Sequence, residues 1–170
     1  VHLFPGVNRA VEGVAIRPDG RFGLVASADN SLYEWDLATG ELVQRLLGHE
    51  GPVEAVAFSP DGTQALSASL DQTLIWWNLT TGSIILRLRS GAGNIHSLHF
   101  LNETQAVTAS TDGTVQIWDL TSAWQLARWG ANGTGHLPPD SGTENRGMEL
   151  AVSPDGQFAL SGGNFPDEQL

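Results

Sequence analysis

Short apolar stretches alternate with compact polar turns along the chain, and apolar periods of 3.6 residues, which would indicate helices, are scarce. Between residues 56 and 89 the stretch "VAF" meets the turn Pro60-Asp61-Gly62, and "QALSAS" follows it. Proline sets the φ angle that such a turn needs, and glycine accepts a positive φ. A third stretch ends at Trp77, and Thr81-Gly82 leads into "SIILRLR". This order predicts four antiparallel strands joined by tight turns.

The same order of stretches and turns recurs along the chain. Val14, Val56 and Leu98 open three copies at intervals of 42 residues, and a fourth copy begins at Leu150 after an interval of 52. The additional residues lie within 130–147, a segment whose Gly, Pro, Ser, Thr and Asn content is typical of a loop. A four-stranded repeat of this length is the period of a propeller blade. The sequence therefore predicts an all-β protein, a β-propeller built from four-stranded antiparallel blades.

Each third strand ends in a Trp, a polar residue and Leu, at 35–37, 77–79 and 118–120. Together with Gly48-His49 and the turn at Asp71, these endings resemble the WD-repeat β-propeller family. The motifs are specific because they recur together at a fixed period over nearly the whole chain. The resemblance implies that residues 1–170 form a partial propeller, with the end of a preceding blade at 1–10, complete repeats at about 11–52, 53–94 and 95–135, an insertion at 130–147 and a partial repeat at 148–170. We expect a segment of a ring of about seven blades, completed by the same longer chain or by other copies.

In the WD-repeat family a His, a Ser or Thr, an Asp and the Trp form a hydrogen-bonded tetrad within one blade. Buried indole, imidazole and carboxylate groups need such partners. The resemblance implies that the second repeat holds the full set. Its members are His49, Asp71, Trp77 and a hydroxyl expected to be Ser69, with Ser67 as the alternative. The first repeat keeps Ser27, Asp29 and Trp35, with Val7 at the His position, and the third keeps Ser110, Asp112 and Trp118, with Gly91 there.

Trp76 departs from its equivalents in the other repeats, Glu34 and Ile117. It is expected either to add packing between blades or to form an exposed contact.

The charge of the chain narrows the classes of partner. It has 8 Lys and Arg against 19 Asp and Glu, a formal net charge of −11, whereas nucleic-acid binding needs clustered basic residues. No apolar run approaches the roughly 20 residues of a membrane-spanning helix. We therefore expect protein partners, no nucleic acid and no membrane insertion. No signal peptide is visible, which favours a cytoplasmic location.

His49 with Asp71 and a serine could also indicate nucleophilic catalysis. The Ser and Asp recur in repeats without the His, which favours a structural role. The chain has no cysteine, which excludes disulfides and cysteine zinc sites. His96 and His99 have a metal-like spacing, but strand positions three apart point to opposite faces. We expect no catalytic residue, no metal site and no cofactor.

The resulting hypothesis is a non-catalytic interaction scaffold that binds partner proteins through loops and blade edges. The alternative is a regulatory or substrate-recruiting propeller domain of a larger enzyme, such as a signalling kinase or protease. The insertion 130–147 is either a partner-specific surface or a tolerated loop. The candidate partner-binding residues, chosen because loops carry function and aromatic residues anchor interfaces, are Trp124, His136, Pro138, Pro139, Asp140, Glu144 and Arg146.

Overall fold

The chain forms a series of antiparallel β-sheets in the computed structural model, which describes residues 7, 9–91, 93–122, 124–129, 149–152 and 159–162, with side chains up to Ser122. Within these residues there are strands and turns and no helix, so no helix here could cross a membrane. The predicted all-β fold of four-stranded antiparallel blades is confirmed.

Three sheets have four strands each, paired in the order of the sequence. Blade one contains β1 (Val11–Ile16), β2 (Phe22–Ser27), β3 (Ser31–Asp36) and β4 (Leu42–Leu47). Blade two contains β5 (Val53–Phe58), β6 (Gln64–Ser69), β7 (Thr73–Asn78) and β8 (Ser83–Arg89). Blade three contains β9 (Ile95–Asn102), β10 (Gln105–Ser110), β11 (Val115–Asp119) and β12 (Trp124–Trp129). A two-stranded sheet holds β13 (Glu149–Val152) and β14 (Ala159–Gly162).

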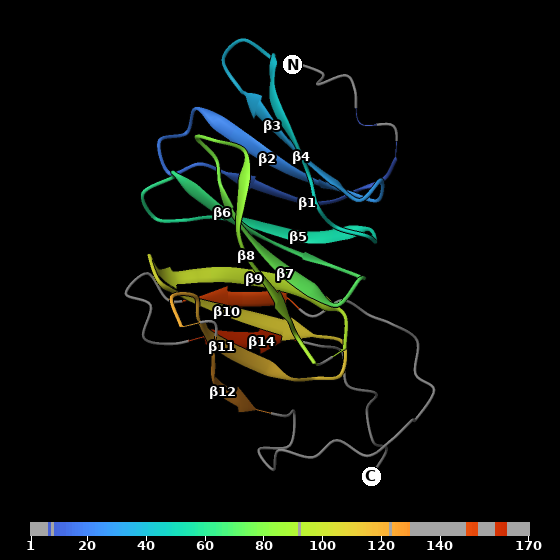
Figure 1. The fold of residues 1–170 in the computed structure, drawn as a ribbon, viewed down its shortest axis with the longest axis vertical. Helices are drawn as coiled ribbons and strands as arrows, with labels where there is room; N and C mark the ends of the chain where they lie inside the picture. Colours follow the sequence, from blue (N-terminus) through green and yellow to red (C-terminus); the bar gives the residue numbers. More distant parts are fainter. Residues whose placement is uncertain are drawn as a thin grey trace.

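The blades follow one another along the long axis of the molecule (Figure 1). The first strands of successive blades contact each other, β1 with β5, β5 with β9 and β9 with β13. The first strand of each blade thus forms its inner edge, and β4 and β8 form outer edges. This arrangement places the turns before each second strand and before each fourth strand at one end of the blades.

The core lies between the blades. One apolar cluster joins Leu24, Leu32 and Leu46 of blade one to Val56 and Trp77 of blade two. An equivalent cluster joins the second and third blades, with Leu66, Leu74 and Leu88 on one side and Leu98 and Trp118 on the other. Trp77 and Trp118, the repeated Trp residues of the second and third blades, therefore pack against the preceding blade. The large apolar surface of Trp explains why the same ending recurs at this position.

Candidate functional site

Blade two contains a continuous chain of hydrogen-bonded side chains. His49 lies between β4 and β5, with its Nδ1 3.0 Å from Oδ2 of Asp71 in the β6–β7 turn. Its Nε2 lies 2.7 Å from the Oγ of Ser67 in β6. The indole Nε1–H of Trp77 in β7 donates to the same Oγ at 2.8 Å. Three of the residues expected from the sequence thus meet through Ser67.

Ser69, the hydroxyl expected in this chain, makes different contacts, and this part of the expectation was wrong. Its Oγ donates to the carbonyl of Gly51 at 2.9 Å and accepts the N–H of Asp71 at 3.1 Å. Both serines lie on one face of β6 because they are two residues apart. Ser67 is paired with Ile75 of β7, whereas Ser69 lies beyond the paired part of these strands. The strand register therefore brings Ser67, and not Ser69, to Trp77.

The carboxylate of Asp71 is held in its charged form. Burial raises its pKa, but hydrogen bonds from the Thr73 hydroxyl, the Glu50 N–H and His49 outweigh burial and lower the pKa to about 2. Burial also lowers the pKa of His49, against the opposing effect of Asp71, so the imidazole is neutral near pH 7. The neutral ring donates from Nδ1 to Asp71 and accepts the Ser67 hydroxyl at Nε2, a tautomer that satisfies every donor in the chain.

These distances also match those of a carboxylate, an imidazole and a nucleophilic hydroxyl. The side chain of Ser67, however, is 0% exposed, and His49 is buried too. The Oγ of Ser67 already accepts the indole N–H of Trp77. Neither of the two pockets described below is lined by these residues. The arrangement joins the strands of blade two and offers no access to a substrate.

Blade three keeps a shorter version of the chain. The indole of Trp118 donates to the Oγ1 of Thr108 at 3.0 Å, so Thr108 takes the place expected for Ser110. The Oγ of Ser110 has no hydrogen-bond partner among the described residues. Asp112 accepts the hydroxyl of Thr114 at 2.6 Å and the backbone N–H of Gly93 at 3.1 Å. A backbone group thus donates to Asp112 in the blade that lacks the His.

Blade one replaces the His with an ion pair. The carboxylate of Asp29 accepts the hydroxyl of Tyr33 at 2.5 Å and Nη2 of Arg45 at 3.1 Å. Burial raises the pKa of Asp29, but these contacts and Ser27 outweigh it and lower the pKa. The Oγ of Ser27 accepts the backbone N–H of Asp29 at 3.2 Å, as Ser69 does in blade two.

Trp35 is buried in β3, but the position equivalent to Ser67 is Val25. The hydroxyl that bridges to the indole in blade two therefore has no counterpart in blade one. The expected grouping of Ser27 with Asp29 and Trp35 was wrong in this respect.

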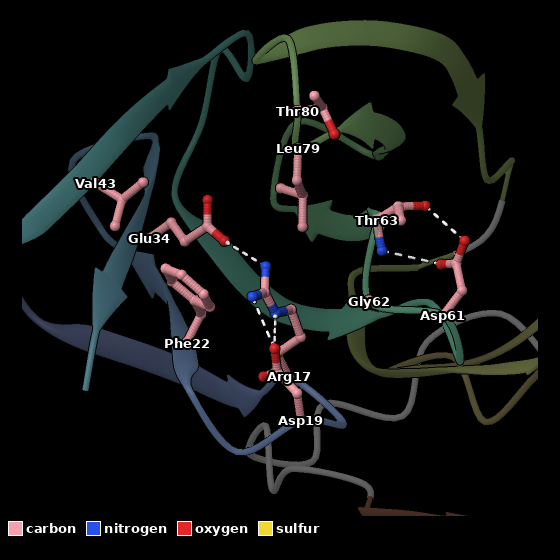
Figure 2. Close-up of a pocket in the computed structure, with 10 residues that line it drawn as sticks. All are labelled: Arg17, Asp19, Phe22, Glu34, Val43, Asp61, Gly62, Thr63, Leu79 and Thr80. Carbon is pink, nitrogen blue, oxygen red and sulfur yellow. Dashed lines mark hydrogen bonds and ion pairs between the residues drawn. The ribbon is translucent and has the colours of Figure 1, made fainter. Parts of the chain in front are cut away.

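A pocket of about 370 Å³ lies between blades one and two, at the end that carries the Pro-Asp-Gly turns (Figure 2). Blade one contributes residues from the β1–β2 turn and from β2, β3 and β4, and blade two contributes its β5–β6 and β7–β8 turns. The residues that line it are Arg17, Asp19, Phe22, Glu34, Val43, Asp61, Gly62, Thr63, Leu79 and Thr80. We call it the blade 1–2 pocket.

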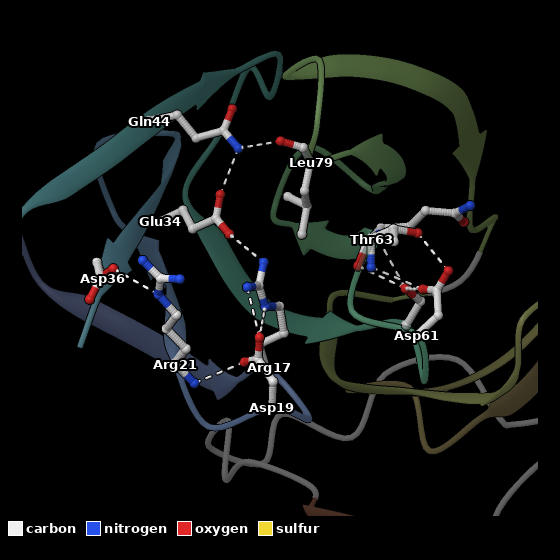
Figure 3. Close-up of polar contacts among 11 residues, drawn as sticks. Arg17, Asp19, Arg21, Glu34, Asp36, Gln44, Asp61, Thr63 and Leu79 are labelled. Atoms are coloured by element: carbon white, nitrogen blue, oxygen red, sulfur yellow. Dashed lines mark hydrogen bonds and ion pairs between the residues drawn. The ribbon is translucent and has the colours of Figure 1, made fainter. Parts of the chain in front are cut away.

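Glu34 lies deep in this pocket, with its side chain 4% exposed. Its Oε2 accepts Nε2–H of Gln44 at 2.6 Å, and the same amide donates to the carbonyl of Leu79 at 2.7 Å (Figure 3). Arg17 binds Asp19 at 2.8 Å, and its guanidinium lies 3.7 Å from the centre of the Phe22 ring. Gln44 therefore joins the two blades at the pocket.

The sequence did not predict this pocket. A usable signal was present, because Glu34 is polar at a position where the other repeats have Trp76 and Ile117. Sequence spacing alone does not show that the turn at Gly62 closes over Arg17. A Cβ at Gly62 would lie 2.7 Å from the Cγ of Arg17, so glycine permits this close approach.

A second pocket of about 410 Å³ is lined mainly by the inner strands β1, β5 and β9. Its walls are mostly apolar, with Val14, Ile16, Phe58 and Phe100 among them. Among the described residues, no group of three or more His, Cys, Asp or Glu is placed to hold a metal ion.

The candidate partner-binding residues fall largely outside the described part of the chain. Trp124 begins β12, where its backbone pairs with Asp119, and its side chain is not described. The residues of the insertion 130–147 lie outside the described residues, namely His136, Pro138, Pro139, Asp140, Glu144 and Arg146. Their role remains a prediction.

Comparison with known proteins adds one finding to this geometry. The family model described as WD domain, G-beta repeat matches three consecutive stretches, residues 1–36, 40–78 and 82–119. Each stretch ends on the polar residue that follows the Trp of a third strand, at Asp36, Asn78 and Asp119. The three stretches together cover well over half of the chain. Among curated proteins no match was found.

Proposed function

Because the chain belongs to the WD-repeat family, we propose that it is a non-catalytic scaffold that binds partner proteins through its loops and blade edges. Domains of this family are generally protein–protein interaction modules and are typically non-catalytic. A rigid framework with variable turns is suited to this task, since binding residues concentrate on loops that a scaffold positions.

The observation that carries this proposal is the use of the polar side chains of blade two. His49, Asp71 and Ser67 have the residue types of a catalytic site, yet they are committed to contacts within the blade. Ser67 also holds Trp77, and no described pocket reaches the hydroxyl. Such a network makes the blade rigid and leaves its turns and edges for recognition.

The first partner that we propose is a further blade, which would pack against the exposed apolar residues of β1. Val14 and Ile16 of β1 are 70% and 67% exposed. Their equivalents in β5, Val56 and Phe58, are only 8% and 9% exposed, because blade one covers them. An apolar strip of this kind is costly in water and marks an interaction face. We expect a further WD-type blade to cover it, from the same longer chain or from another copy.

The insertion 130–147 is the second proposed partner surface, and it can be tested directly. Removal of residues 132–145 is expected to leave folding intact, since the deletion lies outside the three blades described above. It is expected to weaken complex formation, measured by co-purification of the complete protein with its native partners. Association that is unchanged by the deletion would rule out the insertion as the partner surface.

A further inference from the structure

The blade 1–2 pocket differs from the equivalent place between blades two and three. Trp76 and Leu86 there occupy the positions of Glu34 and Gln44, as the strand register shows. Both pack against the apolar cluster between those blades. At the first junction a carboxylate is buried where the same fold accommodates an indole. Burial of a carboxylate is costly, and an apolar side chain would stabilise the junction as well or better.

The charge on Glu34 is only partly compensated. Its Oε2 accepts a hydrogen bond from the Gln44 amide. Among the described residues, the charged group paired with Oε1 is Nη1 of Arg17, at 4.0 Å. That distance is longer than a hydrogen bond. Arg17 is already engaged by Asp19 and by the Phe22 ring. The pocket therefore contains a buried carboxylate oxygen whose ion pair with Arg17, at 4.0 Å, is too long for a hydrogen bond.

Two further carboxylates, those of Asp19 and Asp61, line the pocket. Asp61 accepts hydrogen bonds from the hydroxyls of Ser59 and Thr63 at 2.6 Å each. These contacts, that of Ser59 first, lower the pKa of Asp61, so this carboxylate stays ionised near neutral pH. The pocket is thus lined by three carboxylates, those of Asp19, Glu34 and Asp61, and by one guanidinium, that of Arg17. The balance favours a cation in the pocket.

We propose that the blade 1–2 pocket binds a cationic side chain, arginine or lysine, of a partner protein, with Glu34 as the anchoring carboxylate. Phe22, Val43 and Leu79 supply apolar walls for the alkyl part of such a side chain. Figure 2 shows these three residues around Glu34 and Arg17. The volume of about 370 Å³ lies in the range of sites for small groups. The net charge of −11 favours encounter with a basic partner.

This inference rests on the proposed scaffold function, because the occupant belongs to a partner protein. It is tested first with a small probe, which needs no knowledge of the partner. N-acetyl-L-argininamide and N-acetyl-L-lysinamide are titrated into the complete chain, and backbone amide shifts are followed by NMR. We expect shifts concentrated at Glu34, Thr63 and Leu79. The uncharged analogue N-acetyl-L-citrullinamide is expected to produce none of these shifts.

Glu34→Gln keeps the shape of the side chain and removes its charge. We expect it to weaken binding of the cationic probes at least tenfold. Glu103→Gln is the control, since it removes an exposed carboxylate outside the pocket, in the β9–β10 turn of blade three. It is expected to leave probe binding unchanged. Equal affinities of the wild-type chain and Glu34→Gln, or shifts located elsewhere, would overturn the proposal.

Val43→Lys is a second variant that does not remove Glu34. Val43 lines the pocket and is half exposed, so a lysine there can place its ammonium beside Glu34 from within the chain. We expect this variant to lose probe binding, whereas Val43→Leu keeps it. Retained binding in Val43→Lys contradicts the proposal. Partner complexes that survive in Glu34→Gln would leave the scaffold function standing without this pocket, and absence of any complex with the wild-type chain would remove the scaffold function itself.

Discussion

The indole N–H of Trp77 donates a hydrogen bond of 2.8 Å to the hydroxyl of Ser67, which joins β6 and β7 through side chains as well as backbone. The same hydroxyl is 2.7 Å from His49, so one oxygen serves two buried partners. Thr108 has the equivalent contact with Trp118 in blade three. Each Trp thus packs its apolar surface between blades and also makes a directional hydrogen bond within its own blade.

Ser67→Ala is expected to destabilise the protein more than Ser69→Ala. The first change leaves the Trp77 indole and the His49 ring without their partner, and an unsatisfied buried group costs about 1–3 kcal/mol. We expect a loss of about 2–4 kcal/mol for Ser67→Ala and about 1 kcal/mol for Ser69→Ala, measured by urea unfolding. A larger loss for Ser69→Ala would mean that the second hydroxyl carries the network.

The stability of the chain is expected to fall on the acid side. The folded pKa of Asp71 is about 2, below its ordinary value of 3.8, so the unfolded chain binds its proton first. The stability from Asp71 is present above pH 3.8 and is lost as the pH falls toward 2. Allowing for solvent screening, this loss amounts to about 1–2 kcal/mol.

His49 acts in the same direction at higher pH. Burial lowers its pKa below 6.5, so the unfolded chain takes up this proton first as the pH falls below that value. Unfolding free energies measured from pH 8 to pH 2 are expected to fall in these two regions. Asp71→Asn should show a smaller fall in the lower of the two regions, to which Asp29 and Asp61 also contribute, and an identical profile for this variant would contradict the assignment to Asp71.

Substitutions at two glycines with similar backbone angles allow the cost of backbone strain to be distinguished from the cost of a close contact. Gly20 and Gly62 have φ values of 74° and 72°, but a Cβ meets nothing within 4 Å at Gly20 and lies 2.7 Å from Arg17 at Gly62. Gly20→Ala is expected to cost about 1–2 kcal/mol from the left-handed backbone alone. Gly62→Ala is expected to cost about 1–3 kcal/mol more in thermal or urea unfolding. Equal losses would mean that Arg17 moves aside without cost.

The exposed strip on β1 is tested by paired substitutions. Val14→Asp is expected to change the free energy of unfolding by no more than about 0.5 kcal/mol, because Val14 is exposed. Val56→Asp is expected to cost at least about 3 kcal/mol, because Val56, at the equivalent position of β5, is buried by blade one. If a blade of another copy covers β1, Val14→Asp lowers the assembled fraction in sedimentation velocity. Unchanged assembly would exclude another copy as the blade that covers β1.

The strands, the turns and the repeat can be predicted from the order of the residues alone. Apolar stretches, Pro-Asp-Gly turns and a 42-residue interval depend on local backbone preferences and on the alternation of buried faces. These features predicted four-stranded blades, and the resemblance to the WD-repeat family implied that Trp77 and Trp118 are buried. The structure confirms both.

Which hydroxyl binds Trp77 and where a pocket forms depend on how the strands and sheets pack in three dimensions. Ser67 and Ser69 lie on one face of β6, so their spacing cannot distinguish them, and the register with β7 does. The blade 1–2 pocket combines Arg17 and Glu34 with the turn at Gly62. These residues are distant in sequence, and their separation in space is set by how one sheet packs on the next. Local patterns carry no information on that distance.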